Sequence, residues 1–203
     1  PGCRLVVWRG DVTRLSVDAV VNAANDQGLG CFQPGHRCID NVLHRAAGPR
    51  LRESCRREMA ARRGRLLSAG TEPILTVAHY LPCRHVIHTT GPQLARGRPP
   101  SELQKGQLAH CYRSCLDRCR DAGLRSIAFC CISTGLFGYP SEEAAEVALR
   151  EVRDWLHEPG HSELVDFVVF DVFTGHDEQA YVRHAPAFFN PLLENPQEPL
   201  TSR

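Results

Sequence analysis

The amino-acid sequence predicts an α/β fold, a three-layer α/β/α sandwich around a central mixed, mostly parallel sheet. Two observations carry this prediction. Short runs rich in β-branched residues alternate along the chain with longer segments of helical period. The short runs are too apolar to leave a solvated face, so helices should cover both sides of the sheet.

The first half of the chain holds four strand candidates and two helix candidates. The strand candidates are short and rich in β-branched residues: RLVVW (4–8), DAVVNAA (18–24), PILTVAHY (73–80) and HVIHTT (85–90). Two segments of helical period lie between the second and third of these strands: CIDNVLHRAAG (38–48), which ends at a glycine, and PRLRESCRREMAARR (49–63).

The second half continues the alternation with three helix candidates and two strand candidates. The helix candidates are residues 103–123, 141–158, which begin at a serine, and 177–189, which begin at an aspartate. The strand candidates are RSIAFCCIS (125–133) and LVDFVVFDVF (164–173). Within the helix predicted for residues 103–123, Cys111, Cys115 and Cys119 recur every four residues, so we expect them to share one buried apolar face.

The length of 203 residues suits one domain with a sizeable core. We assign residues 1–190 to this single domain and 191–203 to a Pro-rich tail. The chain begins at Pro1 without a methionine, which is consistent with a domain cut from a longer protein.

Charge and cysteine content exclude several classes of partner. The 24 basic and 23 acidic residues nearly cancel, so no global field would hold nucleic acid or an anionic membrane surface. No apolar run is long enough to span a bilayer. Ten cysteines, several of them in core-like segments, fit reduced thiols better than a disulfide scaffold. We therefore expect a cytoplasmic monomer that binds neither nucleic acid nor membrane.

The segment STGLFGYP (133–140) joins a predicted strand to a predicted helix and is a candidate phosphate-binding loop. Gly135 and Gly138 permit tight turns that would let backbone amides face phosphate oxygens. The spacing fits an ordinary Gly/Pro turn equally well. The loop lacks both the GK[ST] ending and the GxGxxG pattern, so it gives no support for nucleoside triphosphate or dinucleotide redox chemistry.

Six segments, taken in order, resemble the macrodomain family of ADP-ribose-binding α/β/α modules. They are RGDVTRLSVDAVVNAAN, CIDNVLHRAAGPRL, LPCRHVIHTTGP, LAHCYRSCLDRC, RSIAFCCISTGLFGYP and VVFDVF, which together cover most of the chain from residue 9 to residue 173. The resemblance implies an ADP-ribose site formed by Asp11, Val12, Asn25, Ser133, Thr134, Gly135, Leu136, Phe137, Gly138, Tyr139 and Phe173.

The resemblance also implies a role for each part of that site. Asp11 would accept a hydrogen bond from the adenine amino group, although an aspartate at this point also suits a helix N-cap. Asn25 would bind the distal ribose, whereas Asn22 is expected to hold the loop in shape. Residues 133–139 would wrap the diphosphate. Phe173 would lie against adenine, or else belong to the core; Tyr139 would close over the ribose, or else pack inside.

The segment GCFQPGHRCID departs from the glycine-rich run of many hydrolytic macrodomains and resembles the zinc-containing macrodomains of microbial type. Cys31, His36 and Cys38 would be three protein ligands of Zn²⁺ and would leave a fourth position open, as in catalytic zinc sites. Pro34 and Gly35 can fold the loop back so that the ligands converge. Taken as a lone short motif, a chance grouping of two cysteines and a histidine competes with this interpretation.

The expected activity is zinc-dependent hydrolysis that removes mono-ADP-ribose from modified proteins, with Asn25 and Asp40 as the catalytic residues. Asp40 would handle protons or orient water, and Asn25 would orient the ribose. His44, His85 and His88 are expected to be hydrogen-bonded structural residues. The alternatives are a non-catalytic ADP-ribose reader and a hydrolase of O-acetyl-ADP-ribose. By resemblance, a lipoyl-carrier protein and a sirtuin-type ADP-ribosyltransferase are possible partners.

Overall fold

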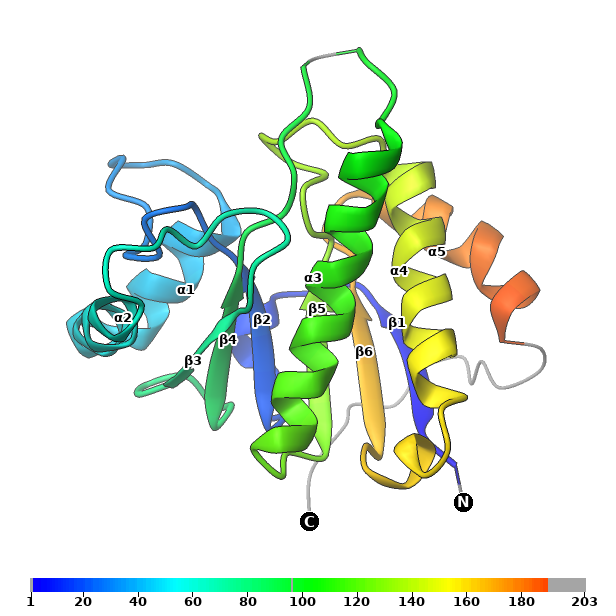
Figure 1. Ribbon diagram of the computed structural model, residues 1–203, viewed down its shortest axis with the longest axis horizontal. Helices are drawn as coiled ribbons and strands as arrows, with labels where there is room; N and C mark the ends of the chain where they lie inside the picture. The colour runs from blue at the N-terminus through cyan, green and yellow to red at the C-terminus, as the bar shows by residue number, and fades with distance from the viewer. Residues whose placement is uncertain (1, 96, 190–203) are drawn as a thin grey trace.

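The computed structural model describes residues 2–95 and 97–189, which build one six-stranded sheet with helices on both faces (Figure 1). The strands are β1 Arg4–Trp8, β2 Ala19–Ala23, β3 Ile74–Val77, β4 His85–Thr89, β5 Ser126–Cys130 and β6 Phe167–Asp171. Their order is β1-β6-β5-β2-β4-β3, and β3 alone runs antiparallel to its neighbour among them. The predicted mixed, mostly parallel sheet is confirmed; the predicted tail, 191–203, lies outside the described residues.

The described residues also form five helices and two short 3-10 helices, of which α5 follows the last strand and the others lie between strands. They are η1 Val12–Arg14, α1 Ile39–Ala47, α2 Pro49–Ala61, α3 Glu102–Asp121, α4 Ser141–Leu156, η2 His161–Glu163 and α5 Gly175–Phe188. In Figure 1, α3 and α4 lie in front of the sheet. The stripe of Cys111, Cys115 and Cys119 on α3 is fully buried, as predicted from its spacing.

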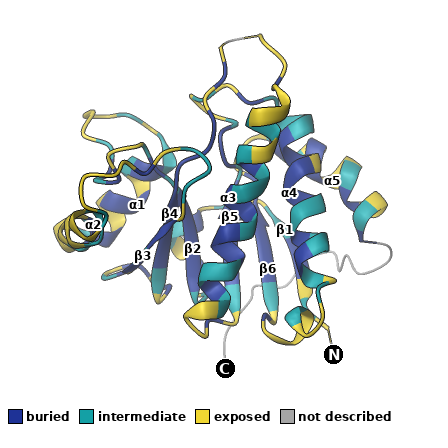
Figure 2. Cartoon of the chain, viewed as in Figure 1, coloured by how far each residue is buried: buried dark blue, intermediate teal, exposed yellow. Residues whose placement is uncertain are grey.

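The two faces of the sheet pack into two separate cores because strand residues alternate in direction. On β5, Ile127 and Phe129 face the core formed with α3, α4 and α5, whereas Ala128 faces the core formed with α1 and α2. Figure 2 shows the strands and the inner sides of α3 and α4 in the dark blue of buried residues. This alternation gives the three layers that the sequence predicted.

The parallel strands all end at one edge of the sheet, where the loops that follow β1, β2, β4, β5 and β6 meet. Any site that the fold builds from loops is therefore expected at this carboxyl edge.

No helix in the described residues is long and apolar enough to cross a membrane. All ten cysteines lie in the described residues and are free thiols.

Candidate active site

A cavity of about 870 Å³ opens at the carboxyl edge of the sheet. It is lined by residues that follow five parallel strands, together with much of the segment between residues 30 and 42. The volume lies within the range of small-molecule sites, and the position is where open α/β sheets bind ligands. Both junctions that the sequence singled out, after β2 and after β5, contribute to its walls.

Asp11 and Val12, which follow β1, and Phe173, which follows β6, line this cavity. Asp11 caps η1: its Oδ1 accepts hydrogen bonds from the Thr13 amide at 3.0 Å and from the Thr13 hydroxyl at 2.6 Å. The capping role is thus confirmed, and a role towards adenine stays a prediction. Phe173 is 74% exposed, so it is a cavity-wall residue and not a core residue.

Asp171 lines the cavity as well, although no role was predicted for it from the sequence. It ends β6, is only 4% exposed, and its Oδ1 has no hydrogen-bond partner among the described residues. Burial raises the pKa of this carboxyl to about 7, and the negative charge of Asp11 adds to the shift. The signal was available: an aspartate interrupts the apolar run VVFDVF.

Residues 133–137 form a turn along the cavity wall after β5. Ser133 takes a left-handed conformation, with φ 69°. Within the described residues, the amides of Gly135, Leu136 and Phe137 donate no hydrogen bond to other protein atoms. Amides left free at the wall of a cavity suit the phosphate cradle better than an ordinary turn does.

Two residues expected in this loop do not reach the cavity. Gly138 and Tyr139 are not among the described residues that line it. Gly138 (φ 68°) turns the chain inward, and the Tyr139 amide bonds back to the Ser133 carbonyl at 3.0 Å. Tyr139 is consequently 2% exposed and packs in the core with α3 and α4, which is the second of the two places expected for it.

Asn25 and Asp40 also line the cavity and lie next to each other. Asn25 follows β2, and its Nδ2 lies 3.3 Å from the Gly30 carbonyl and 3.5 Å from Asp40 Oδ2. Asp40 is the second residue of α1, where a carboxylate is favoured by the free amides of the helix start. The two residues assigned to catalysis therefore come together from separate elements.

Asp40 lies in a nearly dry environment, with 4% of its surface exposed. Burial raises its pKa to about 6, although the hydrogen bond from Asn22 and the charge of Arg52 oppose the rise. His44 Nε2 lies 3.5 Å from Asp40 Oδ1, but neither ring nitrogen of His44 makes a hydrogen bond. Because burial lowers the pKa of His44 to about 4, its ring is neutral and the contact is not an ion pair.

Asn22 has a different role from the one expected. It lies inside β2 and is fully buried, and its Nδ2 donates a hydrogen bond to Asp40 Oδ1 at 2.7 Å. It therefore supports the carboxylate and not the loop after β2. Sequence spacing did not reveal this, because residues 22 and 40 belong to different elements.

Of the three histidines expected to be hydrogen-bonded, His88 alone meets the expectation at both ring nitrogens. His44 has no partner on either nitrogen, and His85 has none on Nδ1, within the described residues. The prediction is therefore wrong for His44. This neutral ring packs against Gly30, where φ is 86° and an added Cβ would lie 2.8 Å from the ring.

Cys31, His36 and Cys38 converge beside Asp40, with their potential ligand atoms all within 4.8 Å of one another. Cys31 Sγ lies 3.4 Å from His36 Nδ1. Two ligands of one tetrahedral zinc ion, at about 2.3 Å for sulfur and about 2.0 Å for nitrogen, would stand roughly 3.5 Å apart. The chemistry and spacing of these three side chains thus fit Zn²⁺.

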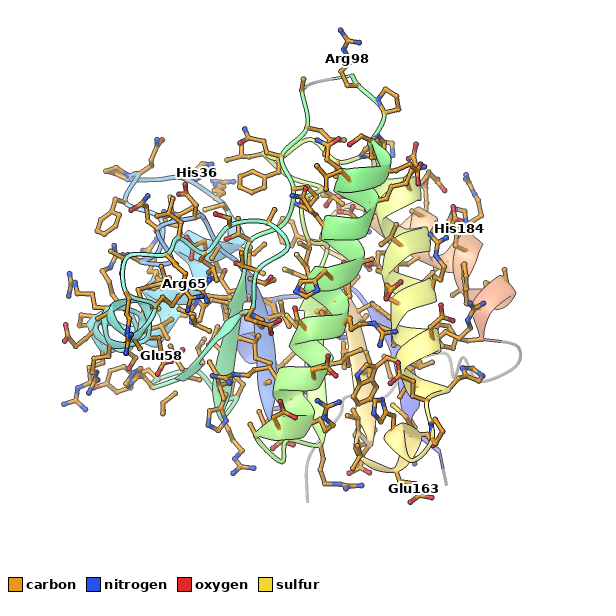
Figure 3. All side chains as sticks on the ribbon, in the orientation of Figure 1. His36, Glu58, Arg65, Arg98, Glu163 and His184 are labelled. Atoms are coloured by element: carbon orange, nitrogen blue, oxygen red, sulfur yellow. The ribbon has the colours of Figure 1, made fainter. Side chains whose placement is uncertain are left out.

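The loop that carries these three side chains is braced from α1 and α2. Asn41 Nδ2 donates hydrogen bonds to the carbonyls of Gln33 and His36, at 3.1 and 2.8 Å. The guanidinium of Arg52, on α2, lies 4.0 Å from the ring centre of Phe32. In Figure 3, His36 is labelled on this loop, above α1. Burial raises the pKa of the Cys38 thiol, a shift that a bound cation would reverse.

Comparison with known proteins identifies the family that has this fold. Residues 21–148 match the family model described as Macro domain. The chain belongs to the Macro domain family. A protein-ADP-ribose hydrolase of Staphylococcus aureus is 46% identical over 180 residues, which are 89% of this chain and 65% of that protein. A probable bifunctional ADP-ribose hydrolase/ADP-ribosyltransferase of Fusarium oxysporum f. sp. cubense is 50% identical over 184 residues, 88% of this chain and 30% of that protein.

Solved macrodomain structures have the same fold. An Oceanobacillus iheyensis macrodomain with ADP is 36% identical, with a TM-score of 0.76 and coverage of 88% of each chain. A Trypanosoma brucei macrodomain in complex with ADP-ribose is 37% identical, with a TM-score of 0.73 over 89% of this chain and 68% of that one. The chain spans less than two thirds of the length of the Staphylococcus and Fusarium relatives.

Proposed function

We propose that this macrodomain is a zinc-dependent hydrolase that removes mono-ADP-ribose from modified proteins. The observation that carries the proposal is the convergence of Asn25, Asp40 and the three candidate zinc ligands at one part of the cavity. The names of the Staphylococcus and Fusarium relatives, and the ADP-ribose in the Trypanosoma complex, support the substrate class.

In the proposed complex, the cavity walls hold ADP-ribose along its length. Asp11 accepts a hydrogen bond from the adenine amino group, and Phe173 lies against the base. The free amides of residues 135–137 bind the diphosphate without a lysine. This remote binding energy positions the distal ribose at Asn25.

Hydrolysis would take place where the ribose joins the protein side chain, at C1''. Asn25 orients the ribose, and Asp40 orients the attacking water or accepts its proton. Cys31, His36 and Cys38 would hold Zn²⁺, which supplies Lewis acidity beside the distal ribose. The low exposure of Asp40 keeps bulk water from competing with the positioned one.

The proposed partner is a mono-ADP-ribosylated protein. The Fusarium relative carries both activities in its name, which supports an ADP-ribosyltransferase, of sirtuin type by resemblance, as the enzyme that makes the substrate. A lipoyl-carrier protein remains the proposed modified protein.

The test measures release of ADP-ribose from a modified protein by wild type, Asp40→Ala and Cys38→Ala, each with its zinc content and its ADP-ribose affinity. We expect Asp40→Ala to keep zinc and ADP-ribose binding but to lose about 100-fold or more in turnover. Cys38→Ala should lose zinc and turnover together. Cys3→Ala is the matched control, because Cys3 precedes β1 at the edge of the sheet opposite the cavity.

Other outcomes would each remove part of the proposal. Full turnover in metal-stripped protein would remove zinc from the mechanism. Tight ADP-ribose binding with no release by wild type would indicate a reader, and cleavage confined to O-acetyl-ADP-ribose would indicate a small-ester hydrolase.

A further inference from the structure

A row of buried polar side chains crosses three neighbouring strands below Asp40. Asn22 on β2 is paired in register with His88 on β4, and Thr76 lies on β3, the next strand (Figure 1). Asn22 and His88 are 0% exposed and Thr76 is 4% exposed. Buried polar groups of this kind are costly unless they are hydrogen-bonded, so their pattern of bonds is informative.

The row forms one continuous chain of hydrogen bonds that ends on the carboxylate. Asn22 Nδ2 lies 2.7 Å from Asp40 Oδ1 and 3.1 Å from His88 Nδ1. His88 Nε2 lies 2.9 Å from the Thr76 hydroxyl, which donates to the Val86 carbonyl at 3.4 Å. The chain therefore runs from the backbone of β4 to the side chain assigned to the reaction.

The chemistry of the groups fixes the direction of each bond. Asp40 Oδ1 accepts one hydrogen of the Asn22 amide, and the other hydrogen points at His88 Nδ1, which must then be an acceptor. His88 consequently carries its proton on Nε2 and donates it to Thr76. The ring is neutral because burial lowers its pKa to about 3.

The same logic explains why His88 matters for Asp40. If the Asn22 amide turned over, its oxygen would face both the carboxylate and the lone pair of His88 Nδ1, two unfavourable contacts. His88 thereby selects the amide orientation that offers a hydrogen to Asp40. Asn22 Oδ1 has no partner among the described residues, so within them these two contacts are what holds the amide.

We propose that Asn22 and His88 are positioning residues that orient the Asp40 carboxylate for hydrolysis of the ADP-ribosyl bond. The proposal rests on the proposed function of Asp40. It adds two residues that are not among the described residues lining the cavity.

A metal site at His88 would be an alternative role for this residue, and it requires the proton on the other ring nitrogen. His44, Cys55 and His88 also bring potential metal ligands within 4.8 Å of one another, and Cys55 Sγ lies 3.6 Å from His88 Nε2. A cation there would take the Nε2 lone pair and move the proton to Nδ1, where it would oppose the Asn22 amide. The chain of hydrogen bonds that runs from Asp40 to the Val86 carbonyl and this metal site therefore require opposite tautomers of His88.

The first experiment compares His88→Asn with His88→Gln. The asparagine amide can place its oxygen near the position of Nδ1 and accept from Asn22, whereas the glutamine amide reaches the position of Nε2 and serves Thr76. We expect His88→Gln to lower kcat by about tenfold to about 100-fold, with KM and ADP-ribose affinity nearly unchanged. His88→Asn should retain a larger share of kcat. His85→Gln, the same replacement at the far end of β4, is the matched control.

The second measurement uses the wild-type protein, so it does not depend on whether a variant folds. Nitrogen-15 NMR of the His88 ring should find the proton on Nε2; a proton on Nδ1, or a metal-bound Nε2, would overturn the proposal. Equal kcat values for wild type and folded His88→Gln would also overturn it, provided that Asp40→Ala is inactive. An active Asp40→Ala variant would instead overturn the proposed function, and the two failures are thus distinguishable.

Discussion

The buried, neutral state of His88 has a consequence for stability that can be measured by itself. In the unfolded chain a histidine has a pKa of about 6.5, whereas burial lowers that of His88 to about 3. Acidification to pH 5 therefore protonates His88 in the unfolded chain but not in the folded protein. The free energy of unfolding must fall as the pH falls through about 6.5, and the loss continues until the pH nears the folded-state pKa.

The magnitude follows from the same two values. Between pH 7.5 and pH 5.0 His88 should remove about 2 kcal/mol from the free energy of unfolding. The raised pKa values of Asp40 and Asp171 act in the opposite direction over this range and would mask the effect in wild type. The difference between wild type and His88→Asn removes most of those contributions and that of His44, since both proteins contain these groups and the asparagine keeps an acceptor for Asn22.

The assay is urea denaturation of wild type and His88→Asn at the two pH values. We expect the stability advantage of wild type to shrink by about 2 kcal/mol on going to pH 5.0. The same difference at both pH values, within the error of extrapolation, would mean that His88 titrates alike in the folded and unfolded states. That result would refute both its burial as a neutral ring and the direction of the hydrogen bonds drawn from it.

Three further predictions concern other parts of the structure. Gly30→Ala should lower both turnover and the free energy of unfolding, because the left-handed backbone and the His44 ring leave no room for a Cβ. The loss of free energy of unfolding should be about 1–3 kcal/mol. Wild-type stability of this variant in urea denaturation would contradict the prediction. Phe173→Ala should weaken ADP-ribose binding by about 1–3 kcal/mol in calorimetry if the exposed ring stacks on the base, and unchanged affinity would exclude stacking. Trp155→Phe should reduce stability by about 1 kcal/mol through loss of the 2.9 Å bond from its Nε1 to Asp117, with turnover unchanged, whereas a loss of turnover would indicate coupling between this core and the cavity.

The sequence predicted the elements of the fold well because strands and helices here have strong local patterns. The six strands and five helices of residues 2–95 and 97–189 lie within or close to the expected ranges. Several strands are shorter than expected: the last is Phe167–Asp171, within the predicted 164–173. The order of the strands and the antiparallel β3 were not predicted, since they depend on contacts between residues far apart in the chain.

The candidate site shows the same difference between local patterns, which the sequence reveals, and contacts between distant residues, which it does not. Cys31, His36 and Cys38 could be grouped in advance because they lie within eight residues of one another. Asn22 and His88 are separated by 66 residues, and nothing in their local sequence indicates that they meet. Tyr139 shows a second limit: outside a helix or strand, no periodicity tells which way a side chain turns.

The candidate zinc loop and the proposed catalytic carboxylate, that of Asp40, are connected through the start of α1. Cys38 is the N-cap of this helix, and its Sγ accepts from the Asn41 amide at 3.4 Å, while Asp40 occupies the first turn. A cation held by Cys38 would therefore also fix the first turn of α1. Asp40 would then be held in two ways, through its backbone at the start of α1 and through the hydrogen bond that Asn22 donates to its carboxylate. Two independent supports for one buried side chain are what a positioned water requires, because an error of about 1 Å in the carboxylate is enough to lower the rate about 100-fold.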